Sequence, residues 1–300
     1  MKVLSGIGIV GVPICLTAGV LFSDVTCVKG VASSGLSDGL IGYWNFDESS
    51  GGIVHDLSGN GYNGAVINYP GGQGSWTSGQ IGGALEFGGP STHQYVSVPD
   101  FAMPTASMTL TTWAWADSIP RWATIAANWN GAWGAFNYAT FGGDPNMSLY
   151  VADGGSPPNI VNITYDVSSA EVSLGQWHFM AVEANSVFHT VTFFQDGAIT
   201  GSFHYDGKLL ASSSLLNIGD DPSDPHPDQA NWDGKIDDLA IWDRALSFSE
   251  LKSIYDAGLA GEPLLTPIPE PSVAAMFCPW IFGIGLFRIV KHFTRSESKG

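Results

Sequence analysis

The sequence predicts an all-β protein, a sandwich of two antiparallel sheets with one short helix near its C-terminal end. Short alternating segments recur through the middle of the chain, glycine is abundant at 38 of 300 residues, and only one soluble stretch has helical spacing of apolar residues. Many short strands joined by tight turns are typical of sandwiches and barrels. With 44% apolar residues, the chain can bury one large core.

The N-terminal segment has the pattern of a secretory signal. Lys2 precedes an apolar run from Val3 to Phe22, which matches the charged and apolar regions of such a signal. We expect a signal peptide over residues 1–33 and a linker over 34–39, with an uncleaved membrane anchor as the alternative. The three cysteines, Cys15, Cys27 and Cys278, all lie outside the long middle, which excludes a disulfide framework or a cysteine zinc site there.

The middle of the chain reads as a succession of strands. The hairpin signal Asp196-Gly197 separates two of them and predicts a type I′ turn. Residues 117–144 contain glycines and aromatic residues without clear alternation and are left unassigned. The predicted strands are Leu40–Phe46, Tyr95–Val98, Met108–Ala116, Met147–Val151, Ile160–Tyr165, Gln176–Ala184, Thr190–Gln195, Ala198–Phe203 and Leu215–Ile218.

The last element of the middle combines a strand and a helix. From Gly234 to Asp243 apolar residues alternate, which predicts a strand with apolar residues on both faces. Ser247 and Glu250 then form a capping-box pattern, apolar residues follow at helical spacing, and Gly258 is expected to end the helix.

The charge of the middle is strongly negative. Between Leu36 and Ile268 there are 25 Asp and Glu residues against 5 Lys and Arg residues, a net charge of −20. Such a surface repels phosphate backbones, so nucleic acid is not expected as a partner. Calcium and neutral glycans suit it better.

Six segments, in the same order along the chain, resemble a laminin-G-like domain of the concanavalin A-like lectin/glucanase superfamily. The resemblance covers residues 40–260 and implies a jelly roll, in which two antiparallel sheets pack face to face. The segments are Leu40–Asp47 with Val54–Gly64, Gly82–Phe87, Gly175–Phe179, Phe194–Gly197, Leu216–Gly219 and Gly234–Ala257.

The C-terminal segment resembles a PEP-CTERM sorting signal. Pro269, Glu270 and Pro271 follow a linker over residues 261–268 and precede an apolar helix predicted over 272–290, with a basic end at 291–300. The resemblance implies export in a Gram-negative bacterium, transient anchoring in the inner membrane, and processing by an exosortase-type enzyme. The expected location is the cell envelope or the extracellular surface.

One loop has the ligand spacing of a calcium site. Asp56, Ser58 and Asn60 place oxygen atoms at the first, third and fifth positions, and a glycine stands at the sixth. The family resemblance points to Asp237, with Asp47 as a further candidate, to complete the shell around a structural Ca²⁺. The alternative is an Asx turn, in which Asp56 and Asn60 bond only to the local backbone.

Two classes of function remain open. The first is a carbohydrate-binding or matrix-binding module, for example one for exopolysaccharide, with Trp122, Trp129, Trp133 or Trp232 as a platform facing the sugar. The second is an adhesive envelope protein that binds other proteins. A glycoside hydrolase is disfavoured because the Glu-x-Asp-x-x-Glu motif of the superfamily's glucanases is absent. Alternation would also place Asp237 and Asp238 on opposite strand faces, where they cannot form a carboxyl pair.

Overall fold

The computed structural model describes residues 35–128, 136–141, 144–152, 160–161, 170–204, 215–222 and 230–265. Two eight-stranded antiparallel sheets form within these ranges. The segments 1–33 and 269–300, predicted to be the signal peptide and the sorting signal, lie outside the described residues. Within the described ranges, no helix is both long and apolar enough to cross a membrane.

The first sheet has the strand order β14-β13-β12-β7-β16-β5-β4, and β1 also pairs with β16. Its long central strands, β7 and β16, pair with each other antiparallel over most of their lengths. The strands are β1 (Leu40–Trp44), β4 (Ser75–Ser78), β5 (Gly83–Gly88), β7 (Met108–Ser118), β12 (Trp177–Asn185), β13 (Thr190–Gln195), β14 (Ala198–His204) and β16 (Asp233–Trp242).

The second sheet has the order β11-β10-β9-β8-β15-β6-β3-β2. A short 3₁₀ turn (Pro70–Gly72) follows β3, and the single described α-helix, α1 (Phe248–Leu259), follows β16. The strands of this sheet are β2 (Ile53–Val54), β3 (Gly64–Ile67), β6 (Tyr95–Val98), β8 (Thr124–Asn128), β9 (Phe136–Phe141), β10 (Asp144–Ala152), β11 (Ile160–Val161) and β15 (Leu216–Ile218). This architecture confirms the predicted two-sheet sandwich with one C-terminal helix.

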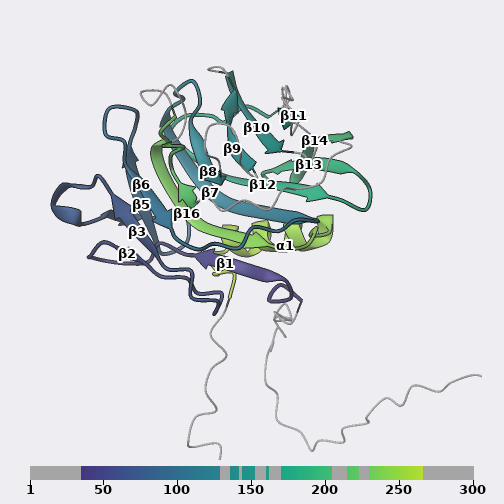
Figure 1. Cartoon of the computed structure of the whole chain (residues 1–300), viewed down its shortest axis with the longest axis horizontal. Helices are drawn as coiled ribbons and strands as arrows, with labels where there is room; N and C mark the ends of the chain where they lie inside the picture. Colours follow the sequence, from purple (N-terminus) through teal and green to yellow (C-terminus); the bar gives the residue numbers. More distant parts are fainter. Residues whose placement is uncertain are drawn as a thin grey trace, which may run out of the picture. The chain divides into compact units, whose positions relative to one another are not determined.

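Two apolar clusters hold the fold together. The larger lies between the sheets and includes Leu110 and Ile241 from the first sheet and Ile125 from the second. The smaller lies on the outer face of the first sheet, where Leu251 and Ile254 of α1 pack with residues of β7, β12 and β16. Figure 1 shows α1 lying along this sheet beside β1 and β16.

The strand predictions fit most closely where one face is buried and the other is half-exposed. β6 and β13 have the predicted bounds, and Asp196 and Gly197 both have positive φ, as a type I′ turn requires. β8 lies within residues 117–144, where no strand was predicted. It is buried on both faces, so apolar and polar residues do not alternate along it. Most of the predicted strand Ile160–Tyr165 falls outside the described residues.

Helix α1 begins as predicted but ends later. The capping box is formed, with Glu250 N donating to Ser247 and Ser247 N donating to Glu250. Gly258 lies inside the helix, and Gly261, with φ of 74°, takes the left-handed position after the C-cap. Glu262 N donates to Ala257 O, which completes a Schellman motif. The prediction that Gly258 ends the helix was therefore wrong.

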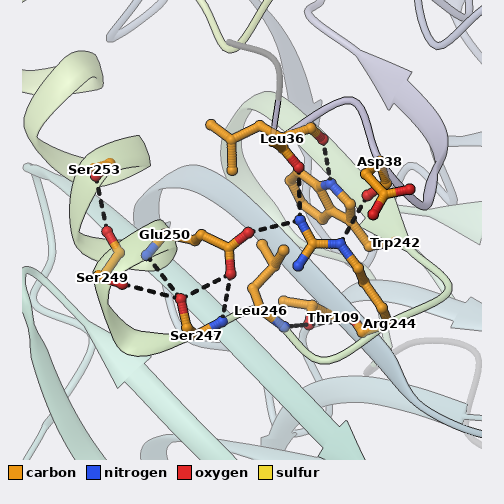
Figure 2. Close-up of polar contacts among 11 residues, drawn as sticks. Leu36, Asp38, Thr109, Trp242, Arg244, Leu246, Ser247, Ser249, Glu250 and Ser253 are labelled. Atoms are coloured by element: carbon orange, nitrogen blue, oxygen red, sulfur yellow. Dashed lines mark hydrogen bonds and ion pairs between the residues drawn. The ribbon is translucent and has the colours of Figure 1, made fainter. Parts of the chain in front are cut away.

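The two ends of the domain are tied together around Arg244, as Figure 2 shows. Its guanidinium donates to the carbonyls of Gly35 and Asp38 and forms an ion pair with Glu250 at 2.7 Å. Nearby, the indole N–H of Trp242 donates to Leu36 O at 2.7 Å. Residues 35–38, predicted as part of a linker, are thus bound to the sandwich.

Candidate functional site

The Asp56 loop, residues 55–63 between β2 and β3, is organised around one carboxylate. Asp56 Oδ1 accepts from the backbone N–H groups of Tyr43 at 3.1 Å and Ser58 at 2.9 Å. Its Oδ2 accepts from Ser58 Oγ and from Tyr62 N, both at 2.9 Å. Both carboxylate oxygens are therefore engaged by donors of the protein.

The other two candidate ligands of the loop, Ser58 and Asn60, bind inward as well. Asn60 Nδ2 donates to the carbonyls of Leu40 at 3.2 Å and Ile41 at 3.1 Å, and Ser58 Oγ donates to Ile41 O at 3.2 Å. These contacts fix the loop to β1. The Asx-turn bond from Ser58 N to Asp56 is thus present, whereas Asn60 bonds to β1 and not only to its local backbone, and a calcium ion in this loop stays a prediction.

Asp47 and Asp237 meet at a different place, the turn between β4 and β5. Asp237 Oδ2 accepts from Ile81 N at 2.9 Å, and Asp47 Oδ1 accepts from Gly83 N. Cβ atoms built on Gly79 and Gly82 would clash with the carboxylates of Asp237 and Asp47, respectively. Close approach of this turn to both carboxylates therefore requires glycine. Asp56, Ser58 and Asn60 form one set, and Asp47 with Asp237 forms another.

A β-bulge in β16 changes which way its carboxylates point. The pairing of β16 with β7 shifts between Asp237 and Ala240, and Asp238 has a φ of 47°. Ile236 and Leu239 consequently both belong to the core between the sheets, although simple alternation would separate them. The expectation that Asp237 and Asp238 lie on opposite faces was wrong: Asp237 contacts Ile81 and Asp238 contacts Tyr43, and both partners belong to the apolar cluster on the outer face of the first sheet.

The paired carboxyl groups are buried, Asp237 completely and Asp238 to 7% exposure. Burial raises the pKa of Asp237, and the negative charge of Asp238 raises it further. Burial also raises the pKa of Asp238, although a hydrogen bond from Tyr43 opposes the shift. The Tyr43 hydroxyl donates to Asp238 Oδ1, and burial raises the pKa of that hydroxyl too.

One oxygen of each carboxyl group lacks a donor. Asp237 Oδ1 and Asp238 Oδ2 are buried without a hydrogen-bond partner. Two adjacent buried carboxylates need a shared proton or a cation between them, because their repulsion is strong in a medium of low dielectric constant. The described residues contain no group of three or more His, Cys, Asp or Glu side chains arranged to hold a metal. Any ion there would need backbone carbonyls or water to complete its shell.

Sequence reasoning missed Tyr43 and Asp238 as members of this site. The available signal was the pair of adjacent aspartates inside an otherwise apolar strand, since buried carboxyl groups are rare unless they have a partner. Tyr43 shares β1 with the backbone that anchors the Asp56 loop. Its N–H contacts Asp56 and its hydroxyl contacts Asp238, so it bridges the two sets.

Of the four tryptophans predicted to face a sugar, Trp122 and Trp232 lie within the described residues. Trp232 is fully buried and donates its indole N–H to Trp115 O at 3.1 Å, so the prediction that it forms a platform was wrong. Trp122 is half-buried, with the Arg121 guanidinium 5.6 Å from its ring centre. Trp129 and Trp133 lie outside the described residues.

Solved structures with the same fold include several binding domains. Domain 4 of AbnA, a GH43 extracellular arabinanase from Geobacillus stearothermophilus solved with arabinotriose, has a TM-score of 0.55 and 19% identity; the match covers 72% of this chain and 98% of that one. The binding domain of Paraclostridial Mosquitocidal Protein 1 has a TM-score of 0.54 and 15% identity, over 74% of this chain and 53% of that one.

The ligand-binding domain of botulinum neurotoxin serotype D, solved with N-acetylneuraminic acid, has a TM-score of 0.52 and 14% identity, over 75% of this chain and 52% of that one. The chain thus spans about half of each of the two toxin domains. No curated protein sequence matches it. The model of the concanavalin A-like lectin/glucanases superfamily matches residues 90–252, more than half of the chain. Together with the two-sheet sandwich, this match shows that the chain belongs to the concanavalin A-like lectin/glucanases superfamily.

Proposed function

We propose that the chain is a non-catalytic module that binds glycan, such as the polysaccharide of an extracellular matrix. The observation that carries the proposal is the sandwich itself, because it matches 98% of an arabinanase domain solved with arabinotriose. A second domain with this fold was solved with N-acetylneuraminic acid. The net charge of −17 favours uncharged sugars over anionic ones, since like charges repel.

The position of the carboxyl pair supports a non-catalytic role. A glycosidase needs two carboxyl groups that flank the scissile bond of a bound substrate. Asp237 is fully buried and Asp238 is 7% exposed, beside the residues of α1 and the segment that follows it. A sugar ring therefore has no access to the pair. Its contacts to Tyr43 and Ile81 give it a structural role.

The test of glycan binding is affinity electrophoresis of the full chain in gels that contain arabinan, xylan, galactomannan or mixed-linkage glucan. We expect retardation in at least one gel and no release of reducing sugar on incubation with that polysaccharide. Retardation in none of them would overturn the glycan-binding proposal. Release of reducing ends would overturn its non-catalytic part.

We also propose that Ca²⁺ stabilises the jelly roll at the bulge in β16. The support is the chemistry of the site: two buried carboxylate oxygens without donors, with Asp47 close enough to raise both pKa values through its charge. Asp237 and Asp238 would hold the ion, and backbone carbonyls or water would complete its shell. The Asp56 loop is the weaker candidate because its carboxylate already accepts four hydrogen bonds.

Thermal unfolding with CaCl₂ and with EDTA tests the calcium proposal. We expect calcium to raise Tm in the wild type, and the Asp237→Asn variant to lose most of that rise. The matched control Asp56→Asn removes one charge from the other loop and should keep the response. If Asp56→Asn abolishes the rise and Asp237→Asn does not, the ion belongs to the Asp56 loop. An unchanged Tm in the wild type would contradict calcium binding altogether.

We further propose export to the envelope of a Gram-negative bacterium, with the C-terminal segment acting as a sorting signal. The support is the order of Pro269-Glu270-Pro271, an apolar run and a basic end. Cell fractionation of the wild type and of the Glu270→Ala variant tests whether the C-terminal segment directs the chain to the envelope. Mass spectrometry of the surface form tests whether an exosortase-type enzyme removes the tail. A surface form with the complete tail would contradict processing.

A second candidate function is adhesion to a protein partner. The observation in its favour is the tip of the hairpin between β12 and β13, where Val187 and Phe188 are 75% and 72% exposed. Exposed apolar patches mark protein–protein contact sites, and this tip offers two adjacent apolar side chains. Binding to envelope proteins that survives enzymatic removal of glycans and disappears in Phe188→Ala would favour adhesion over glycan binding.

A further inference from the structure

A row of side chains crosses the outer face of the first sheet. Trp177 on β12 lies directly opposite Trp115 on β7, Trp115 lies opposite Lys235 on β16, and Lys235 lies opposite Glu86 on β5. Neighbouring strands are about 4.8 Å apart, so this outer row is about 14 Å long. We call these four residues, Trp177, Trp115, Lys235 and Glu86, the outer row.

Helix α1 leaves the outer row uncovered. The neighbouring aromatic pair on the same face, Trp113 and Phe179, is buried beneath Tyr255 of the helix, with ring centres 5.8 and 5.9 Å from that of Tyr255. Two residues away on these strands, Trp115 and Trp177 are only partly buried, and Glu86 on β5 is exposed. The helix therefore closes one part of the face, and the sheet presents aromatic rings on the adjacent part.

The contacts within the outer row fix its rings. The rings of Trp115 and Trp177 are 6.0 Å apart and meet edge to face at 65°. Trp115 Nε1 donates to Asp117 Oδ1 at 2.9 Å, and Lys235 Nζ lies 5.0 Å from the Trp115 ring centre. On the other side of the sheet, the buried Trp232 donates to Trp115 O and so holds the strand in place.

We propose that the outer row is the saccharide-binding surface of this chain and that its ligand is an extended, uncharged glycan. The proposal rests on the glycan-binding function proposed above. The apolar faces of sugar rings pack on indole rings, while their hydroxyl groups need donors and acceptors at the edges. Lys235 supplies donors and Glu86 supplies an acceptor on the β16 side of the tryptophan pair, and Asp117, two residues from Trp115 on β7, supplies a second acceptor.

The charges of the surface identify the class of sugar. One cation, Lys235, stands between two carboxylates, Glu86 and Asp117, so the site has a net negative charge within a chain of net charge −17. An anionic polymer such as a sulfated or uronic-acid-rich glycan would be repelled. The lysine stem is long and flexible, so its ammonium can turn from the Trp115 ring to a hydroxyl group when a sugar arrives.

The test compares variants of the full chain, purified in a zwitterionic detergent, by affinity electrophoresis in arabinan, xylan, galactomannan and mixed-linkage glucan. Trp177→Ala removes one ring, Trp177→Phe retains an aromatic surface, and Lys235→Met retains the stem but removes the donors. Phe188→Ala is the matched control, because it removes an exposed ring just beyond the opposite end of β12. Unchanged Tm values verify folding.

In the gel that retards the wild type, we expect Trp177→Ala to weaken binding roughly tenfold, the loss that one stacking contact of about 1.4 kcal/mol gives. Trp177→Phe should recover part of the affinity, Lys235→Met should be intermediate, and Phe188→Ala should bind as the wild type does. If the wild type binds and Trp177→Ala binds equally well, the outer row is not the saccharide-binding surface, although the glycan-binding proposal stands. No binding by the wild type would overturn both. A dimer that Trp177→Ala dissociates would assign the surface to a second copy instead.

Discussion

At the scale of single residues, the carboxyl pair in β16 makes stability depend on pH. Burial raises the pKa of Asp237 to about 9, far above the value of about 4 in an unfolded chain. Between these values the folded state binds more protons than the unfolded state, so the free energy of unfolding falls as pH rises. Below about pH 4 Asp237 is protonated in both the folded and the unfolded state, so its burial no longer lowers the free energy of unfolding.

The variant Asp238→Asn tests this dependence in EDTA. An amide at position 238 keeps an acceptor for Tyr43, offers N–H donors to Asp237, and removes one of the two repelling charges. We expect a higher Tm than the wild type at pH 8 and a flatter profile from pH 5 to 9, measured by thermal unfolding. The exposed Asp100 provides a control, since Asp100→Asn should leave the slope unchanged. If Tm changes with pH equally in the wild type and in Asp238→Asn, the carboxyl pair is not the cause of the pH dependence.

Gly258 shows how packing overrides local preference. Alanine is favoured over glycine in a helix by about 1 kcal/mol. A Cβ atom at this position would lie 2.5 Å from Trp113 Nε1, and Trp113 is buried and has little room to move. We expect Gly258→Ala to lower the free energy of unfolding by about 1–3 kcal/mol in urea denaturation. The loss should shrink in a Trp113→Phe background, and an equal loss in both backgrounds would rule out the contact as its cause.

At the scale of elements, the start of α1 depends on Glu250. Its hydrogen bond with Arg244 and those with Ser247 lower the pKa of Glu250 to about 2. A lowered pKa means that the carboxylate stabilises the fold above its ordinary pKa of about 4.3 and loses this effect as pH falls toward 2.

Glu250→Gln separates the charge from the cap. Glutamine can still complete the capping box but cannot pair with Arg244. We expect a loss of about 1 kcal/mol at pH 7, kept small because the pair is partly exposed, and a much smaller loss at pH 2, where about half of the Glu250 carboxyl groups are protonated in the folded state. Asp256→Asn, which breaks the exposed pair with Lys252, is the control and should change little at either pH. A loss of the same size at pH 2 would mean that the cap, and not the charge, carries the effect.

The elements also show what the sequence can and cannot predict. Strands with one buried and one half-exposed face, such as β6, follow from alternation, and the capping box located the start of α1. The bulge in β16 could not be predicted, because two adjacent aspartates fit either phase of the alternation. β8 could not be predicted because it is buried on both faces. At the Asp56 loop, ligand spacing and turn chemistry use the same residues, so the sequence alone could not separate them.

At the scale of the whole molecule, the fold is closed by contacts between its two ends. β1 pairs with β16, and residues 35–38 bind Arg244 and Trp242 beside the closing helix. Removal of residues 35–39 would leave the indole N–H of the buried Trp242 without its acceptor. An unsatisfied buried donor costs about 1–3 kcal/mol. The opening segment therefore stabilises the last strand, although it lies about two hundred residues away in sequence.

A truncation series tests this closure. We expect a fragment of residues 35–265 to unfold cooperatively in urea, and a fragment of residues 40–265 to unfold at a lower midpoint with the same m-value. Trp242→Phe, which removes the indole donor and leaves the same smaller ring in both fragments, is the matched change. It should destabilise the longer fragment, where Leu36 O accepts that donor, and cost less in the shorter one, where the acceptor is already missing. Equal costs in both fragments would show that the two ends of the chain are not coupled through Trp242, and the loss on truncation would then belong to the Arg244 contacts alone.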